Sequence, residues 1–321
     1  MQPSSRIYIA GHRGLVCSAI ERRCRALGFD NLLLRTRAEL DLRSQSAVER
    51  FFAANRPEYV FLAAALAGGI HAHNTHPVDY IRDNLLIATH VIDAAWRNGA
   101  RKLLFLGSSC LYPRYALQPM REEYLFTGLL EPTSQWSAIA KLAGLKICQA
   151  LRAQDGFDAI SVLPASLYGP GDNFDLETSR VVPALVRKID AAMTDGAAAV
   201  KVWGTGKPRR EFLHVDDFAD ACLFLMEKYS GAAPVNVGWG DDISIEELAS
   251  SIARIVGFQG RLEFDTARPD GPAQRLLDVS RLSALGWHAD TDLETGLRST
   301  WNWYREHLLN DEGAPRLRGA A

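Results

Sequence analysis

The sequence predicts an α/β protein: a Rossmann-type, doubly wound parallel sheet with a smaller C-terminal α/β lobe. Three observations predict this fold. Short apolar runs alternate with amphipathic stretches through the first half of the chain. The first apolar run enters a turn that contains Gly11 and Gly14. After Pro164 the alternation gives way to a polar, glycine-rich loop and then to shorter elements.

The regular elements of the first half follow each other at short intervals. The predicted strands are Ile7–Ala10, Asn31–Arg35, Tyr59–Ala64, Lys102–Gly107 and Ala159–Pro164. The predicted helices between them are Leu15–Leu27, Ser46–Asn55, Pro77–Asn98 and Ser134–Gln154. Strands joined by helical crossovers of this length form a parallel sheet with helices on both faces.

The elements after the loop are assigned to the smaller lobe. They are a helix near Val181–Met193, a strand near Val200–Trp203, a helix after Asp216, a strand at Val235–Val237, and helices Ile245–Val256 and Leu293–Leu308. The predicted division is a Rossmann domain over residues 1–165 and a lobe formed mainly by residues 166–309, interleaved with it. Residues 310–321 lack apolar periodicity, so we expect a disordered tail there.

Composition and charge argue against several classes of protein. The 36 basic and 38 acidic side chains give a formal charge of -2, so no overall field attracts nucleic acid or an anionic membrane. No apolar run approaches the roughly 20 residues of a membrane helix, and the N-terminus lacks a signal-peptide core. The five cysteines are scattered, which favours reduced thiols in the cytoplasm and no metal site.

The glycine turn favours a dinucleotide site, the alternative being an ordinary βα turn. Gly11 and Gly14 lie where the first strand meets the first helix, a place at which backbone approaches a pyrophosphate. The third glycine of such turns is replaced by Cys17. A Cβ and a sulfur at this position would push the helix outward or crowd the cofactor.

Arginines at the end of the second strand favour NADP(H) over NAD. Arg35 and Arg37 stand where an acidic residue would accept the ribose hydroxyls, and Arg13 lies in the glycine turn. Guanidinium groups match a 2′-phosphate well. The Rossmann domain is therefore predicted to bind NADP(H); a basic strand end exposed to solvent is the alternative.

Two stretches carry candidate chemistry. Ser108 and Cys110 follow the strand Lys102–Gly107, at the edge of the sheet that borders the ligand crevice. Ser137 and Lys141 are four residues apart, so their side chains project from one helix face. For the first stretch, capping serines and a small buried cysteine are the alternative.

Motifs along nearly the whole chain resemble those of the GDP-L-fucose synthases. They include GHRGLV, LRTRAELDL, AAALAGGI, HNTHP, LLFLGSSCLYP, AIAKLAG, LYGPGDNF, VWGTGKPRREFLHVDD and RPDGPAQRLLDV. Several are long and idiosyncratic, which makes the resemblance more specific than a general Rossmann match. It implies an extended short-chain dehydrogenase/reductase fold, NADP(H), a GDP-sugar substrate and a homodimer.

The resemblance also implies roles for individual residues. The cofactor would be held by Gly11, Arg13, Gly14, Arg37, Asp41, Leu42, Leu106, Lys141, Pro164 and Leu167. The GDP-sugar would be contacted by Lys188, Trp203, Arg210 and Asp270. Ser108 would hydrogen-bond the sugar carbonyl, and Cys110 would be an acid/base in epimerisation. Trp203 in the core, and Arg210 paired with Glu211 or Asp216, are the alternatives.

The chain departs from the family pattern at two catalytic positions. Ser137 stands where the family has a tyrosine, and Arg180 stands where it has the histidine partner of the cysteine. A serine hydroxyl is a much weaker acid than a phenol and is shorter by a ring. A guanidinium stays protonated, although it could stabilise an enolate or bind a phosphate. A phenol relocated from Tyr115 or Tyr124 is an open alternative.

Three functions follow from these residues. The first is an NADP(H)-dependent reductase and/or epimerase of a GDP-linked 4-keto sugar, catalytically altered at Ser137 and Arg180. The second is an epimerase without net redox change, in which Cys110 is the single base and NADP is structural. The third is a non-catalytic protein that binds a nucleotide or nucleotide-sugar, for example as the partner subunit of an active homologue.

Overall fold

The computed structural model describes residues 1–309 and is built around a six-stranded sheet. The strand order is β10-β5-β4-β3-β1-β2, and every paired neighbour is parallel. The strands are β1 (Ile7–Ala10), β2 (Leu32–Leu33), β3 (Tyr59–Leu62), β4 (Lys102–Leu106), β5 (Ala159–Pro164) and β10 (Val235–Val237). Strands β1, β4, β5 and β10 are buried throughout, as apolar strands covered on both faces should be.

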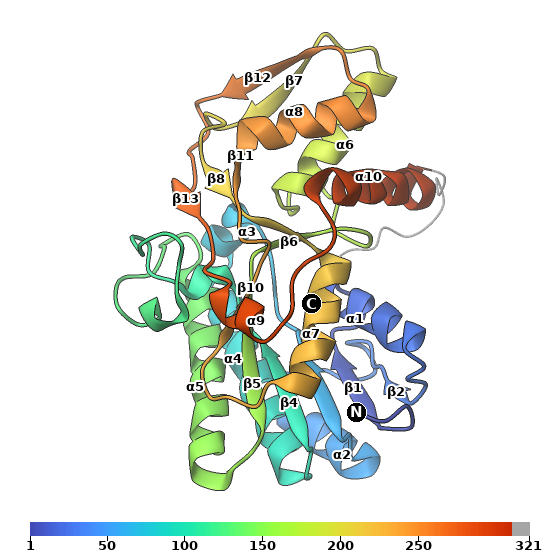
Figure 1. Cartoon of the computed structure of the whole chain (residues 1–321), viewed down its shortest axis with the longest axis vertical. Helices are drawn as coiled ribbons and strands as arrows, with labels where there is room; N and C mark the ends of the chain where they lie inside the picture. Colours follow the sequence, from blue (N-terminus) through green and yellow to red (C-terminus); the bar gives the residue numbers. More distant parts are fainter. Residues whose placement is uncertain (310–321) are drawn as a thin grey trace.

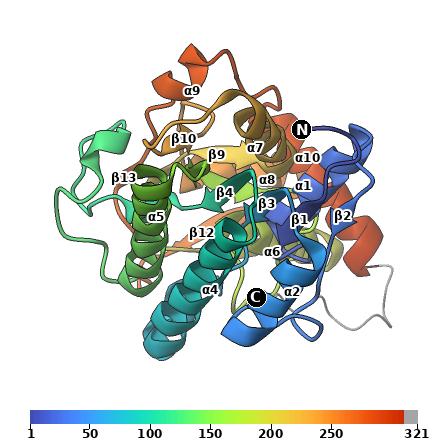
Figure 2. The same cartoon turned by 90° about the horizontal axis from the view of Figure 1, so that it is seen from below.

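Helices cover both faces of this sheet (Figure 2). One layer consists of α2 (Gln45–Asn55), α4 (Pro77–Arg97) and α5 (Gln135–Asp155), and the other of α1 (Leu15–Ala26) and α7 (Val215–Lys228). The predicted doubly wound Rossmann-type fold is confirmed. Because β1 pairs with β2 on one side and β3 on the other, the order reverses at β1 and β3, which is where such sheets bind ligands.

A smaller lobe with its own core lies above the sheet in Figure 1. Its helices are α6 (Val181–Thr194), α8 (Ile245–Val256) and α10 (Leu293–Tyr304), and its parallel strand pair is β7 (Ala199–Trp203) with β12 (Arg261–Asp265). Short strands connect it to the main sheet. They are β6 (Ser166–Tyr168) with β9 (Phe212–His214), and β8 (Arg209–Arg210) between β11 (Ile243–Ser244) and β13 (Gln274–Arg275).

Two elements expected in the smaller lobe, a strand and a helix, belong to the Rossmann domain instead. Strand β10 pairs with β5, in the register Val235↔Val162, and α7 packs beside α1. The expectation was wrong because a three-residue apolar strand looks the same whichever sheet it joins. The chain thus leaves the Rossmann domain at Pro164, forms part of the lobe, and returns to complete the sheet.

Other differences are local. Strand β2 is shorter than predicted, and α10 ends at Tyr304 in a π-turn, Arg305–Leu309. The unpredicted helices are α3 (Ile70–Thr75), α9 (Ser280–Ala284) and the 3-10 turns Ser109–Leu111 and Glu122–Tyr124. The predicted disordered tail lies outside the described residues. Within residues 1–309 no helix is long and apolar enough to cross a membrane, and no three His, Cys, Asp or Glu side chains are grouped to bind a metal.

Candidate active site

The glycine turn lies at the reversal point of the sheet. Gly11 has φ +97°, and a Cβ built on it would lie 3.0 Å from Cα of Ala64, so only glycine fits here. Gly14 caps α1 without a side-chain partner, which leaves the N–H groups of the first helical turn available to an anion. The imidazole Nδ1 of His12 is shielded from solvent and has no hydrogen-bond partner. These features fit a bound pyrophosphate.

The thiol of Cys17 packs into the core behind the turn. Its Sγ donates to the carbonyl of Ala10 at 3.1 Å, and the side chain is buried. Burial raises the pKa of Cys17 to about 12, so the group stays a neutral thiol. The sulfur thus lies between α1 and the end of β1.

Basic side chains follow β2, as expected for a 2′-phosphate site. Arg35 turns back, donating to the carbonyl of Leu34 and lying over the ring of Phe51, whereas Arg37 is exposed. The nearby carboxylate of Glu39 accepts hydrogen bonds from the N–H and hydroxyl of Thr36, both at 2.8 Å. Arg37 is therefore the better placed of the two arginines to meet a phosphate.

The next turn is held by an ion pair. Arg43 binds both Asp41 and Asp83, and its hydrogen bond to Asp41 lowers the pKa of that carboxyl to about 2. The carbonyl of Leu42 lies 3.2 Å from Nδ1 of His90. These contacts fix the loop in which Asp41 and Leu42 were expected to border the adenine.

Lys141 lies at the end of β4, next to residues 108–111, the predicted catalytic turn. Lys141, on α5, donates from Nζ to the carbonyls of Leu106 and Gly107, at 2.9 and 3.0 Å. Pro164 ends β5, and Leu167 follows in β6. The side chains of Leu106 and Leu167 are buried in the main core.

Ser108 and Cys110 form one turn at the end of β4. The Oγ of Ser108 accepts from the N–H of Cys110 at 3.2 Å. Burial opposes ionisation of the Cys110 thiol, but Arg275, Ser108, Arg180 and Ser134 outweigh it and lower its pKa overall. Burial and Arg180 lower the pKa of Lys141 to about 8, against the opposing charge of Cys110. The turn, Lys141 and Arg180 thus form one electrostatic cluster.

The hydroxyl of Ser137 has a partner on the neighbouring helix. Nδ2 of Asn84, on α4, donates to Oγ of Ser137 at 3.4 Å. The Asn84 amide is itself fixed by the backbone of Leu66, through bonds of 2.6 and 3.1 Å. The hydroxyl of Ser137 is therefore bound to a side chain of α4.

The open alternative of a relocated phenol gains no support from Tyr115 or Tyr124. The Tyr115 side chain is 82% exposed and packs under Arg114. Tyr124 packs against the main hydrophobic core. Both belong to the loop between β4 and α5, which projects from the side of the molecule in Figure 1.

The predicted GDP-sugar residues form a second group around Trp203. This indole is 56% exposed, and both Nζ of Lys188 and the guanidinium of Arg268 lie 4.8 Å from its centre. Asp270 accepts from the N–H and hydroxyl of Thr205 at 2.9 and 2.7 Å. Trp203 is thus not a core residue, and its exposed ring could stack on a base.

Arg210 connects this group to the catalytic turn. Burial and Arg275 lower the pKa of Arg210 to about 10, while Cys110 and Asp270 oppose the change. The two acidic residues considered as its partners are engaged elsewhere. Glu211 accepts from the N–H groups of Gly240 and Leu277, and Asp216 pairs with Arg22.

Sequence reasoning missed five residues of the site: Asn84, Ser134, Asp172, Arg268 and Arg275. Arg268 and Arg275 lie in the motif RPDGPAQRLLDV, where two basic residues flanking Asp270 were the available signal. Asp172 lies in the motif LYGPGDNF, and its Oδ2 is shielded from solvent without a hydrogen-bond partner. Ser134 precedes Ser137 by three residues at the start of the same helix, and this spacing was the available signal. Asn84 had no signal, because only the packing of α4 against α5 brings it to Ser137.

We expect Asp172→Asn to stabilise the protein at neutral pH. Burial raises the pKa of Asp172 from 3.8 to about 6, so the folded state binds the proton more tightly than the unfolded chain. The free energy of unfolding then falls as the pH rises from about 4 to 6, and the full destabilisation by ionised Asp172 is present at pH 7. The variant should gain on the order of 2 kcal/mol in free energy of unfolding at pH 7.

Denaturant unfolding of both proteins at pH 4 and pH 7 checks this expectation. The gain should be much smaller at pH 4, where Asp172 is protonated in the folded state and partly protonated in the unfolded chain. Asp175→Asn is the matched control, because hydrogen bonds from Thr178 lower the pKa of that exposed carboxyl. A gain for Asp172→Asn as large at pH 4 as at pH 7 would contradict the assigned cause.

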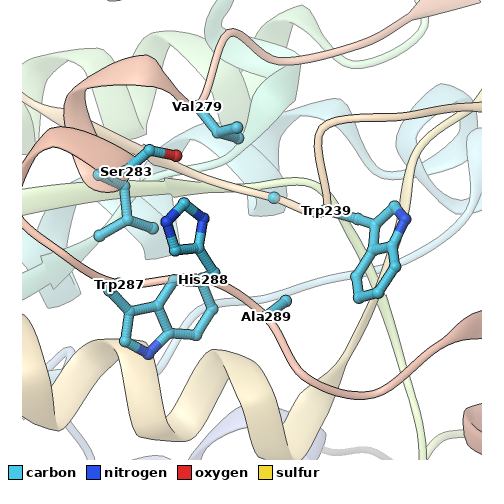
Figure 3. A pocket seen from close by; sticks show the side chains of 8 residues that line it. Trp239, Val279, Ser283, Trp287, His288 and Ala289 are labelled. Carbon is cyan, nitrogen blue, oxygen red and sulfur yellow. The ribbon is translucent and has the colours of Figure 1, made fainter.

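A cavity of about 160 Å³ lies in another part of the molecule (Figure 3). Its walls include the indoles of Trp239 and Trp287 and the imidazole of His288, beside Ser283 of α9. None of the predicted site residues lines it, and its lining contains no lysine or arginine to hold a diphosphate. The candidate active site is therefore placed at the carboxyl ends of β1 and β4, where α5 and β13 contact the end of β4 and the turn after it.

Known proteins share this sequence pattern over almost the whole chain. A family described as "NAD dependent epimerase/dehydratase family" matches residues 7–238. GDP-L-fucose synthase 1 of Arabidopsis thaliana is 54% identical over 307 residues, which cover 96% of this chain and 95% of that relative. The chain belongs to the GDP-L-fucose synthase family. The resemblance expected from the motifs is thereby confirmed.

Solved structures of related proteins share the fold. A GDP-6-OMe-4-keto-L-xylo-heptose reductase from C. jejuni has a TM-score of 0.90 at 38% identity, covering 95% of this chain and 99% of that one. A GDP-L-fucose synthetase from Naegleria fowleri bound to NADP has a TM-score of 0.88 at 26% identity, with 98% and 97% covered. This chain has Ser137 and Arg180 at the two positions where the family pattern was expected to place a tyrosine and a histidine.

Proposed function

We propose that this protein acts on a GDP-linked 4-keto sugar with NADP(H), and that proton exchange at Cys110 outpaces net reduction. The proposal rests on one observation: the surroundings of Cys110 favour its ionisation, whereas Ser137 offers only a weakly acidic hydroxyl. Cys110 is surrounded by cations and hydroxyls that favour its thiolate. Ser137 offers a hydroxyl bound to Asn84 in place of a phenol. Proton abstraction beside a carbonyl is therefore better supported than proton donation to the carbonyl oxygen.

NADP(H) is the cofactor. The glycine turn, the N-terminus of α1 and Arg37 would hold its phosphates, and Lys141 would hold the nicotinamide ribose. When bound, the reduced cofactor supplies hydride for the keto carbon. The related structure from Naegleria fowleri contains NADP, which supports the same cofactor here.

The protein groups would act on the sugar as follows. The Cys110 thiolate takes the proton from the carbon beside the keto group and returns a proton to it as the thiol. The hydroxyl of Ser108 and the ammonium of Lys141 stabilise the enolate oxygen. Reduction at the keto carbon would need a proton from Ser108, Lys141 or water, because the Ser137 hydroxyl is a poor acid. An altered balance between epimerisation and reduction follows.

Two further expectations belong to this proposal. A homodimer is implied by the resemblance and is checked by analytical ultracentrifugation. A cytoplasmic location agrees with the five free cysteines, four of which are buried.

Binding and turnover together test the proposed function. The protein should bind NADPH and GDP in titration calorimetry, and should exchange or reduce GDP-4-keto-6-deoxymannose. Binding of both ligands with neither exchange nor reduction of any GDP-4-keto sugar would favour the non-catalytic alternative and overturn the proposal.

We expect Arg37→Ala to weaken NADPH binding about 10- to 100-fold, as loss of a charged hydrogen bond to a phosphate should. NADH binding should change little, because NADH lacks the 2′-phosphate. Fluorescence titration with both nucleotides measures the two affinities. Arg22→Ala, an exposed arginine paired with Asp216, is the matched control. Equal weakening of NADPH and NADH would contradict the assigned contact.

A further inference from the structure

We propose that Arg275, on β13, is a positioning residue that holds the Cys110 thiolate in the catalytic turn, in place of the histidine partner. Three observations carry this inference: the hydrogen bond of Arg275 to the turn, the anchoring of its backbone, and the identity of the charges around the thiol. The catalytic role of Cys110 rests on the proposed function, whereas the ionisation of its thiol does not.

The guanidinium of Arg275 reaches the catalytic turn directly. Its Nη1 donates to the carbonyl of Ser109, the residue before Cys110, at 2.7 Å. The two residues are 166 positions apart in the sequence, so only the fold brings them together. A half-buried arginine that is fixed by a backbone carbonyl keeps its charge in one place beside the thiol.

The backbone around Arg275 is anchored on several sides. Arg275 pairs with Arg210 in the parallel register of β13 and β8, and its carbonyl accepts from the N–H of Glu211 at 3.2 Å. The N–H of Leu276 donates to Oε1 of Gln118 at 2.8 Å, and its carbonyl accepts from Met120 at 2.7 Å. The segment after β13 is thereby tied to the loop that follows the catalytic turn.

The charges that face Cys110 come from four elements. They are Arg275 on β13, Arg180 before α6, Lys141 on α5 and Arg210 on β8. The hydroxyls of Ser108 and Ser134 complete the surroundings of the thiol. Among these groups Arg275 has the largest favourable effect on the pKa of Cys110, and burial opposes it. Arg180 is exposed, whereas Arg275 is fixed by its bond to Ser109.

This arrangement differs chemically from a Cys–His pair. A histidine can accept and return a proton near neutral pH, and its charge is lost as the pH rises. A guanidinium keeps its charge throughout this range and accepts no proton. The charge of Arg275 should therefore favour the Cys110 thiolate equally throughout this range, so the thiolate population should rise with pH while this neighbouring charge stays the same.

Alkylation of the thiol tests the inference without any sugar nucleotide. Iodoacetamide should modify Cys110 at a rate that follows its thiolate, because Cys17, Cys24, Cys148 and Cys222 are buried. Arg275→Gln should slow alkylation at neutral pH about three-fold or more and move the profile to higher pH. Arg275→Lys should restore most of the rate. Cys110→Ser, which lacks this thiol, measures the background alkylation of the other cysteines.

Two controls separate charge from structure. Arg121→Gln removes an exposed arginine that pairs with Asp278, near the same segment, and should leave the alkylation profile unchanged. If Arg275→Gln does not fold by circular dichroism, Arg275→Met keeps the apolar part of the side chain and serves instead. The inference is overturned if the alkylation rate of the neutral variant follows the same pH profile as that of the unchanged protein.

The outcome is independent of the proposed function. A shifted alkylation profile in a protein that neither exchanges nor reduces GDP-4-keto sugars would sustain the role of Arg275 and overturn the proposed activity. An unshifted profile in an active enzyme would overturn the role of Arg275 and sustain the proposed activity.

Discussion

Replacing Ser137 with tyrosine should raise the rate of NADPH-dependent reduction by about 10²-fold or more, the usual contribution of a positioned general acid. Tyrosine at this position lies one helical turn from Lys141 on α5, so the ammonium can stabilise the phenolate. Burial lowers the pKa of Lys141 to about 8, which places this group near working pH. Steady-state NADPH oxidation with GDP-4-keto-6-deoxymannose measures the gain.

Ser137→Phe is the matched control for this gain. It introduces the same ring without the hydroxyl, so it should fill the space beside Asn84 without increasing reduction. Equal gains in the tyrosine and phenylalanine variants would show that filled space, and not the acid, limits the rate. No gain in either variant would mean that Arg180, Cys17 or a different sugar limits the protein instead.

Cys110→Ser should reduce solvent deuterium exchange into the sugar by about 10²-fold or more. A serine hydroxyl is far less acidic than the thiol, so the surrounding cations cannot hold it as an anion at neutral pH. Mass spectrometry of the GDP-4-keto sugar recovered from heavy water measures the loss.

The control for this loss is Cys148→Ala. Cys148 is buried on α5, and burial raises the pKa of its thiol to about 12, so its removal should leave exchange unchanged. Exchange in Cys110→Ser at the unchanged rate would exclude Cys110 as the base. Water or another group of the site would then have to abstract the proton.

The parts of the site that could be predicted from the sequence are those carried by continuous motifs. The turn of Gly11 and Gly14, the pair Ser108 and Cys110, and Lys141 each lie at the end of a strand or on one helix face, where local spacing fixes their position. The structure brings Ser108, Cys110 and Lys141 together, as the motifs implied. Strands β1, β2, β3, β4 and β5 of the central sheet were predictable for the same reason.

The remaining features depend on contacts between distant segments. Arg275 reaches the catalytic turn only because β13 joins β8 and its continuation joins the loop after the turn. Strand β10 and helix α7 were placed in the wrong lobe because nothing in a short apolar run says which sheet it enters. The partner of Ser137, Asn84, comes from the packing of α4 against α5. Periodicity within one segment carries no information about such pairs.

The most direct measurement of the proposed function is a single incubation in heavy water with NADPH and GDP-4-keto-6-deoxymannose, followed by absorbance and by product mass. The unchanged protein should place deuterium on the carbon beside the keto group faster than it oxidises NADPH. Oxidation of NADPH as fast as, or faster than, deuterium uptake would contradict the claim that proton exchange at Cys110 exceeds reduction.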